Sequence, residues 1–341
     1  MLEHGGRLRQ AAVQYSIPIA DWLDLSTGIN PDGWLVPTVP TSAWGQLPED
    51  NDGLEQAARE YYNAEYLLPV AGSQAAIQAL PQLRAPSRVG VFDPGYAEHR
   101  HAWQRAEHFV TPVTAKSVDQ AVSELEVLVL IHPNNPTGEC FPVEQLLAWY
   151  GQLATHGGWL VIDEAFMDAT PEMSLVPHAT RPGLIVLRSL GKFFGLAGAR
   201  VGFVCAQPEL LTRLNAMLGP WTLSTPARWV ASAALRDRAW QQTFRQRLLD
   251  NSARLRALLT RHELAPDGGC VLFQWVRTPQ AAAMHERLAH QGILTRLFTD
   301  PPSLRFGLPN TEANWQRLDT ALVHAAACDL AWVNPCAPAR R

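Results

Sequence analysis

A single lysine, Lys192, stands in the apolar segment SLGKFFGLAGARVG, three residues after Ser189 and eight before Arg200. A lysine ammonium loses hydration in such a setting, so burial favours the neutral amine. A neutral amine can attack an aldehyde, whereas a serine hydroxyl and an arginine guanidinium are typical phosphate ligands. The segment therefore indicates an amine nucleophile beside an anion site, although a lysine that reaches the surface would explain Lys192 taken alone.

Three further polar side chains come in the few residues after short apolar runs. They are Tyr96 in DPGY, Asn135 in HPNNPTG and Asp163 in LVIDEAF. A tyrosine ring can lie on a planar ligand, a Pro-Thr-Gly turn can hold an amide rigidly, and a carboxylate after a buried strand needs a positive or hydrogen-bonding partner. Each residue also has a structural explanation, as a cover of the core, an Asx-turn or a helix cap.

The stretch VAGSQAAIQALP places Gly72, Ser73 and Gln74 at the start of a predicted helix. Free N–H groups, a hydroxyl and the helix dipole would then meet at one point, which favours an anion. A plain helix N-cap is the alternative for so short a motif.

Together these groups match the parts of pyridoxal 5′-phosphate (PLP). Its aldehyde would take Lys192, its pyridinium nitrogen would take Asp163, and its ring would lie against Tyr96. Asn135 would donate to its O3′ oxygen, and the two anion-binding loops would take its phosphate. The combination of these groups at successive loops, rather than any one of them, carries this interpretation.

The elements that must position these residues are read from the apolar runs. SRVGVFDPGY, LEVLVLIHPNNPTG, GGWLVIDEAF and GLIVLRSLGK each predict a buried strand followed by a loop, and PVEQLLAWYGQLATHGG predicts a helix between two of them. This alternation indicates an α/β fold with a mainly parallel sheet, whose ligand site lies beyond the carboxyl ends of the strands. We expect a large domain over residues 31–222. Residues 1–30 plus 223–341 are assigned to an N-terminal arm and a small α/β domain.

Composition excludes several classes of protein. The 341-residue chain is 47% hydrophobic with a net charge of −4 and no long basic run, which argues against nucleic acid or a membrane surface as the main partner. The start has no apolar signal segment and the longest aliphatic run is too short to span a bilayer, so a cytoplasmic location is expected. Five widely spaced cysteines favour neither a disulfide framework nor a metal site. Cys140, Cys205 and Cys270 are expected to be reduced thiols, and Cys328 and Cys336 receive no role.

The NPTG, DEAF and SLGK…AGAR blocks, in this order and spacing, resemble those of the fold-type I PLP-dependent enzymes, the aspartate aminotransferase superfamily. The resemblance covers nearly the whole chain and implies a homodimer with its sites near the interface. It implies a covalent bond from the cofactor to Lys192 and an Asp163 contact with the pyridine nitrogen, which makes these two residues the catalytic candidates. The remaining cofactor contacts that it implies are Gly72, Ser73, Gln74, Tyr96, Asn135, Ser189 and Arg200.

Within the superfamily, the chain is similar to the branch that contains histidinol-phosphate aminotransferases and threonine-phosphate decarboxylases. Two N-terminal segments resemble the decarboxylases: the opening HGG, His4 to Gly6, and DLSTGINPDG, residues 24–33. Arg296 stands at the position where members of the branch bind a substrate phosphate. Arg305 holds the position of the carboxylate-binding arginine. The resemblance implies a lyase of cobalamin biosynthesis that converts L-threonine O-3-phosphate to (R)-1-amino-2-propanol O-2-phosphate and CO2. Its substrate-binding candidates are His4, Gly5, Gly28, Asn135, Arg296 and Arg305.

Three residues depart from the pattern of aminotransferases. Phe166 stands where these enzymes usually have tyrosine, as it does in decarboxylase relatives, and Leu47 replaces a tyrosine that reaches the neighbouring subunit's cofactor phosphate. Gly28 stands where relatives often have asparagine. Since Lys192 and its segment serve both reactions, a histidinol-phosphate or related aminotransferase is the first alternative. A catalytically silent PLP-binding or scaffold protein is the second.

Overall fold

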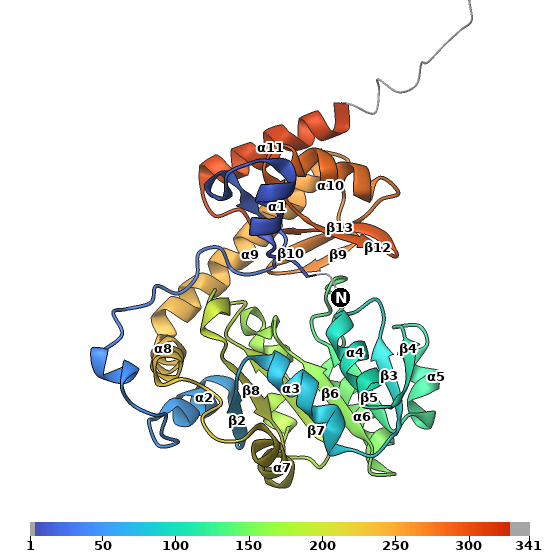
Figure 1. Cartoon of the computed structure of the whole chain (residues 1–341). Coiled ribbons are helices and arrows are strands. Elements are labelled where there is room, and N and C mark those ends of the chain that lie inside the picture. Colours follow the sequence, from blue (N-terminus) through green and yellow to red (C-terminus); the bar gives the residue numbers. More distant parts are fainter. Residues whose placement is uncertain (1–3, 328–341) are drawn as a thin grey trace, which may run out of the picture.

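A seven-stranded sheet forms the centre of the larger of two bodies in the computed structural model, which describes residues 4–327 (Figure 1). The strand order is β2-β8-β7-β6-β5-β3-β4, and β8 is the strand that runs antiparallel to its neighbours. The predicted mainly parallel α/β fold is thereby confirmed. The strands are β2 (Leu67–Val70), β3 (Arg88–Phe92), β4 (Phe109–Val113), β5 (Val127–Ile131), β6 (Trp159–Asp163), β7 (Leu184–Ser189) and β8 (Gly202–Cys205).

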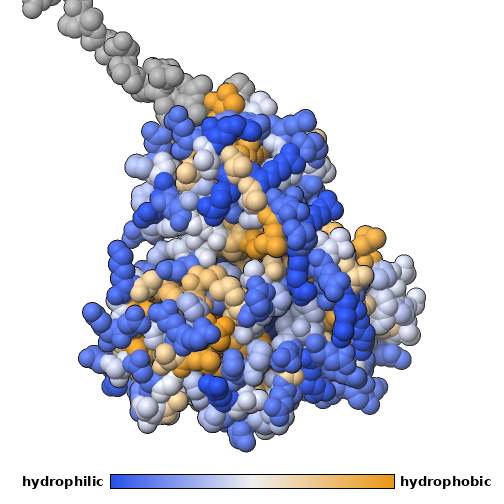
Figure 2. All heavy atoms as spheres, turned by 180° about the vertical axis from the view of Figure 1, so that it is seen from behind, coloured by the Kyte–Doolittle hydropathy of each residue, from blue (hydrophilic) through white to orange (hydrophobic). Residues whose placement is uncertain are grey.

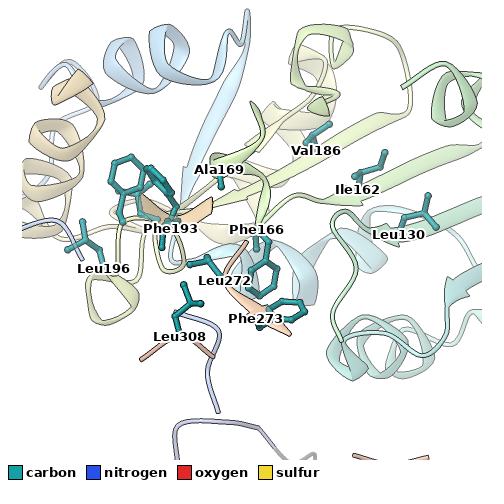
Figure 3. Packing of buried hydrophobic residues seen from close by; sticks show 14 of the residues in the cluster. Leu130, Ile162, Phe166, Ala169, Val186, Phe193, Leu196, Leu272, Phe273 and Leu308 are labelled. Atoms are coloured by element: carbon teal, nitrogen blue, oxygen red, sulfur yellow. The ribbon is translucent and has the colours of Figure 1, made fainter. Parts of the chain in front are cut away.

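Both faces of this sheet are buried, because its strands carry apolar residues without alternation. Along β5, Leu128 and Leu130 enter one core cluster, whereas Val127 and Val129 enter another on the opposite face. Figure 3 shows Leu130, which lies on β5, with counterparts from β6 and β7 in the first of these clusters. Helices α3 (Ser73–Ala79), α4 (Ala97–Arg105) and α7 (Pro208–Leu218) cover one face, and α5 (Val118–Ala121) and α6 (Val143–Ala154) cover the other.

Two long helices lead from the large body to the small one. They are α8 (Thr225–Arg236) and α9 (Arg238–Arg261). The small body has an antiparallel sheet of order β12-β13-β10-β9. Its elements are β9 (Gly268–Cys270), β10 (Phe273–Arg277), α10 (Ala281–Ala289), β11 (Ile293–Leu294), β12 (Arg296–Thr299), β13 (Pro302–Gly307) and α11 (Glu312–Ala327).

The N-terminal segment packs on the small body. Its strand β1 (Leu23–Asp24) pairs in parallel with β11, and its helix α1 (Leu8–Tyr15) contributes Ala11 to a cluster with Ala289 and Leu294. The segment then runs to helix α2 (Leu54–Tyr62) of the large body. The packing places the segment in the same body as α10, while the boundaries at residues 30 and 222 stay a prediction.

The two bodies share an apolar contact. Phe166, just after β6, meets Phe273 of β10 with ring centroids 5.2 Å apart and an interplanar angle of 86°, and Figure 3 shows the two rings side by side. This edge-to-face contact continues the core of the large body into the small one. Phe166 therefore packs between the two bodies as well as lining a cavity between them.

Two further predictions concern thiols and membrane segments. Within residues 4–327, Cys140, Cys205 and Cys270 form no disulfide, whereas Cys328 and Cys336 lie outside the described residues. Among the helices of the described part of the chain, none is both long and apolar enough to cross a bilayer.

Candidate active site

A cavity of about 360 Å³ lies where the large body, the small body and the N-terminal segment meet. This volume is within the range that small-molecule ligands occupy. The carboxyl ends of β5, β6 and β7 contribute Ile131, Asp163 and Ser189 to its wall, as expected for a parallel sheet. The predicted residues that line it are His4, Gly5, Ser73, Gln74, Tyr96, Asn135, Asp163, Ser189, Lys192, Arg200, Arg296 and Arg305.

One end of the cavity is suited to a phosphate. Ser189 Oγ accepts a hydrogen bond of 3.1 Å from the N–H of Gly191, so its own hydroxyl hydrogen is left to donate. The guanidinium of Arg200 lies against Gly72, where an added Cβ would come within 2.5 Å of Nη2, and Gly72 also has a φ of 72°. Any other residue at position 72 would be strained and would displace the arginine. Gly72 thus shapes this end without lining it.

Asp163 is buried at the end of β6 with both oxygens engaged. Oδ1 accepts from the N–H of Ala165 at 3.0 Å, and Oδ2 lies 3.0 Å from Nε2 of His99. The His99 ring is almost fully buried on α4, so the carboxylate keeps a fixed orientation. Because a carboxylate only accepts hydrogen bonds, Nε2 of His99 carries the proton. His99 was missed by the sequence analysis, although its place three residues after Tyr96 puts it in the same first helical turn.

Lys192 lies at the centre of the cavity wall. Its Nζ is 3.5 Å from the carbonyl oxygen of Thr27 and 5.3 Å from the centroid of the Phe166 ring. Burial lowers the pKa of Lys192 to about 8, and the nearby positive charge of Arg305 acts in the same direction, while Asp163 opposes both. An amine with this pKa is partly neutral near pH 7, which is the state that the sequence analysis required.

Arg305 is buried on β13 and is held by two acceptors. Nη1 donates to Oδ1 of Asn135 at 2.5 Å, and Nη2 donates to the carbonyl oxygen of Ser26 at 2.7 Å. Because Oδ1 of Asn135 is engaged in this way, its amide N–H groups are the ones left to donate to a ligand. Burial lowers the pKa of Arg305 to about 10. Its Nε has no hydrogen-bond partner among the described residues.

The second arginine, Arg296, stands directly opposite Arg305. Strands β12 and β13 pair in antiparallel register with Arg296 facing Arg305, and both side chains line the cavity. Like charges at directly opposed positions of a strand pair destabilise the sheet. Two adjacent cations in a cavity therefore indicate a ligand with more than one negative group.

The structure adds detail on two of the predicted residues, Gln74 and Gly28. The side chain of Gln74 is held by protein groups: Nε2 donates to Glu98 at 3.0 Å, and Oε1 accepts from the hydroxyl of Tyr96 at 3.3 Å. A phosphate contact at this position is thus left to the start of α3 and not to the Gln74 amide. Gly28 does not line the cavity, but an added Cβ there would lie only 3.2 Å from Cδ1 of Phe273, and its φ of 61° favours glycine.

Comparisons with known proteins agree with this geometry. The model of the family "Aminotransferase class I and II" matches residues 46–322. The chain belongs to this family. It is 57% identical to the threonine-phosphate decarboxylase of Pseudomonas aeruginosa, over 95% of this chain and 98% of that protein, and 40% identical to that of a Sinorhizobium species, over 94% and 97%. A crystal structure of histidinol-phosphate aminotransferase from Sinorhizobium meliloti, in complex with pyridoxal-5′-phosphate, matches with a TM-score of 0.80 at 21% identity and covers 96% of each chain.

Membership in the class I and II aminotransferases confirms the fold-type I resemblance and PLP as the cofactor. It leaves the role of each side chain to be tested. The roles of Lys192, Asp163 and the other residues of the cavity stay predictions, now with a common location and defined contacts.

Proposed function

We propose that the protein decarboxylates L-threonine O-3-phosphate to (R)-1-amino-2-propanol O-2-phosphate and CO2, as a step of cobalamin biosynthesis. The observation that carries this is the 57% identity, over 95% of this chain, to the Pseudomonas aeruginosa threonine-phosphate decarboxylase. The opposed arginines of the cavity support it, since the substrate carries both a carboxylate and a phosphate. Histidinol phosphate, by contrast, has no carboxylate.

The residues present fit PLP. Lys192 is an amine of lowered pKa, Asp163 is a buried carboxylate, and Ser189 and Arg200 form a phosphate end, all on one cavity. When bound, PLP would withdraw electrons from the substrate Cα bond that stands perpendicular to its ring. Lys192 would hold the cofactor through Nζ, and the carboxylate of Asp163 would favour a proton on the ring nitrogen.

Residues of the small body would then orient the substrate and so determine which bond to its Cα breaks. Arg305 is fixed by Asn135 and by the Ser26 carbonyl, so a substrate carboxylate bound to its outer face has a defined direction. Arg296, with His4 beside the cavity, would hold the phosphate at the other end of the substrate. Two anchored ends leave little freedom of rotation about Cα, which is what selects loss of CO2 over loss of a proton. Lys192 Nζ would supply the proton that replaces the carboxylate at Cα.

The test is incubation of the purified enzyme with O-phospho-L-threonine and no 2-oxo acid. We expect release of CO2 in step with loss of substrate, because decarboxylation needs no amino-group acceptor. Turnover that requires a 2-oxo acid would instead identify an aminotransferase. Cofactor absorbance without any turnover would support a silent PLP-binding protein.

We also propose that the protein is a homodimer. Five large apolar side chains within residues 31–222, Leu35, Trp44, Leu47, Phe109 and Trp221, are each more than half exposed. Figure 2 shows a mostly hydrophilic face on which apolar residues gather in separate patches, the broadest of them on the large body. Large contiguous apolar patches mark association surfaces, and we place the interface at the segment that carries Leu35, Trp44 and Leu47. Leu47, whose counterpart in relatives reaches the neighbouring subunit, points away from its own core in the same way.

Light scattering is expected to give twice the chain mass of 37.7 kDa. The pair Trp44→Asp and Leu47→Asp is expected to shift this mass toward the monomer, because two charges would be buried at the interface. Val13→Asp, at an equally exposed site on α1 of the N-terminal segment, is the matched control and should leave the mass unchanged. A monomer for the unaltered chain would overturn the proposal.

A further inference from the structure

The carboxylate of Glu98 lies next to a cavity whose arginines and lysine favour anionic ligands. It lies in the first turn of α4, is mostly buried, and does not line the cavity itself. Oε1 lies 2.7 Å from Nε2 of His4, and Oε2 accepts from Nε2 of Gln74 at 3.0 Å. Both of these partners line the cavity. Glu98 thus joins two cavity residues that come from different parts of the chain.

The contact with His4 spans the two bodies. His4 belongs to the N-terminal segment, which packs on the small body, and the next residues are tied there because the N–H of Gly6 donates to Oγ of Ser26 at 2.8 Å. Glu98 belongs to the large body. The pair therefore connects the N-terminal segment to the large body beside the cavity.

The contact also sets the direction of the His4 ring. An ionised carboxylate can only accept, so Nε2 of His4 must carry a hydrogen. The ring packs against Tyr96 with centroids 5.8 Å apart, which limits its remaining rotation. On the other oxygen of Glu98, the Gln74 amide is fixed at both ends, since its Oε1 accepts from the Tyr96 hydroxyl. The carboxylate of Glu98 thereby orients two cavity residues. One is His4, which is proposed to contact the substrate phosphate, and the other is Gln74 at the start of α3.

We propose that Glu98 is a positioning residue for the substrate phosphate, which it serves by holding His4 over the cavity. The proposal rests on the proposed function, because His4 is taken to contact the phosphate of threonine phosphate. A carboxylate at this place would repel a phosphate if it faced the ligand, so its position behind His4 and Gln74 is the one that helps binding. The effect should appear in substrate affinity and not in the chemical step.

The first experiment compares Glu98→Gln with the unaltered holoenzyme. We expect the KM for O-phospho-L-threonine to rise about tenfold, the loss typical of one charge-assisted hydrogen bond, with kcat changed less than about threefold. Binding of L-threonine, which lacks the phosphate and is followed through the absorbance of the bound cofactor, should not change. An equal loss for both ligands would show a general structural effect and would overturn the proposal.

Two comparisons make the route through His4 explicit. Gln78→Ala removes the other amide that donates to Oε2 of Glu98, at 3.2 Å, without touching the cavity, and should leave the KM unchanged. In a His4→Ala background, Glu98→Gln should have little further effect, because its partner is already gone. Additive losses in the double variant would mean that Glu98 does not act through His4.

Hydrogen exchange supplies a readout that needs no substrate. The amide of Gly6 is expected to exchange faster in Glu98→Gln than in the unaltered protein, and Gln78→Ala should match the unaltered protein. If the unaltered enzyme releases no CO2 from threonine phosphate, the proposed function fails. The exchange measurement would still show whether Glu98 holds the N-terminal segment in place. Unchanged exchange at Gly6 would show that Glu98 does not fasten the segment.

Discussion

Replacing Lys192 by alanine is expected to lower CO2 release from threonine phosphate by at least about a thousandfold. The substitution removes the amine that we propose as the covalent anchor of the cofactor and as the proton donor to the substrate Cα, and a positioned proton donor alone contributes about 10²–10⁴-fold. The cofactor should still bind weakly at the phosphate end through Ser189 and Arg200. Initial rates and the absorbance of the bound cofactor measure the two losses separately.

The chain offers a clean control, because Lys116 and Lys192 are its only lysines. Reduction with borohydride should fix the cofactor to one of them, and peptide mapping should find it on Lys192. Lys116→Ala should keep both activity and label. Label on Lys116, or full activity of Lys192→Ala, would contradict the assignment.

The pH dependence of cofactor uptake tests the same amine. With a pKa of about 8, the neutral fraction of Lys192 in the cofactor-free protein rises tenfold per pH unit below 8 and levels off above it. The rate of covalent attachment should follow this curve, whereas an ordinary lysine would keep gaining up to about pH 10.5. Arg305→Met removes a positive charge that lowers this pKa, so it should move the curve to higher pH. If Arg305→Met leaves the curve in place, the charge of Arg305 does not affect the pKa of Lys192.

The sequence predicted the cofactor end of this site because that end lies on local motifs. The predicted residues Tyr96, Asn135, Asp163, Ser189 and Lys192 each lie at or soon after the end of a parallel strand in one sheet. The carboxyl ends of such strands meet at one edge of the sheet. Knowing the strands was therefore enough to bring Asn135, Asp163 and Ser189 together. The fold class followed from the same alternation of strands and helices.

Strand register and the contacts between distant segments could not be predicted in this way. The register that sets Arg296 opposite Arg305 depends on the bulge-free pairing of two short strands, and the union of His4 with Glu98 depends on how the N-terminal segment crosses to the large body. Neither contact leaves a periodic signal in the sequence. His99 and Glu98 also read as ordinary polar residues of a surface helix, until the helix is placed with its first turn against the cavity.

Asp163→Asn is expected to slow CO2 release about a hundredfold to a thousandfold, the range seen when one preorganised electrostatic group is removed from an active site. Asparagine has nearly the same shape and can still accept from the N–H of Ala165. It lacks the negative charge that would favour a proton on the ring nitrogen, so the loss should fall on kcat more than on KM. Because Lys192 is intact, the cofactor should remain covalently bound, and its absorbance should shift as the ring nitrogen loses its proton.

His99→Gln tests how much of that effect depends on orientation. Glutamine can donate to Oδ2 of Asp163 but does so from a flexible chain, whereas the buried His99 ring holds the carboxylate at 3.0 Å. We expect a loss of about tenfold, smaller than that of Asp163→Asn because the charge remains. The double variant should be little slower than Asp163→Asn alone, since His99 acts on catalysis only through the carboxylate. A double loss equal to the product of the two single losses would mean that His99 contributes to catalysis independently of Asp163.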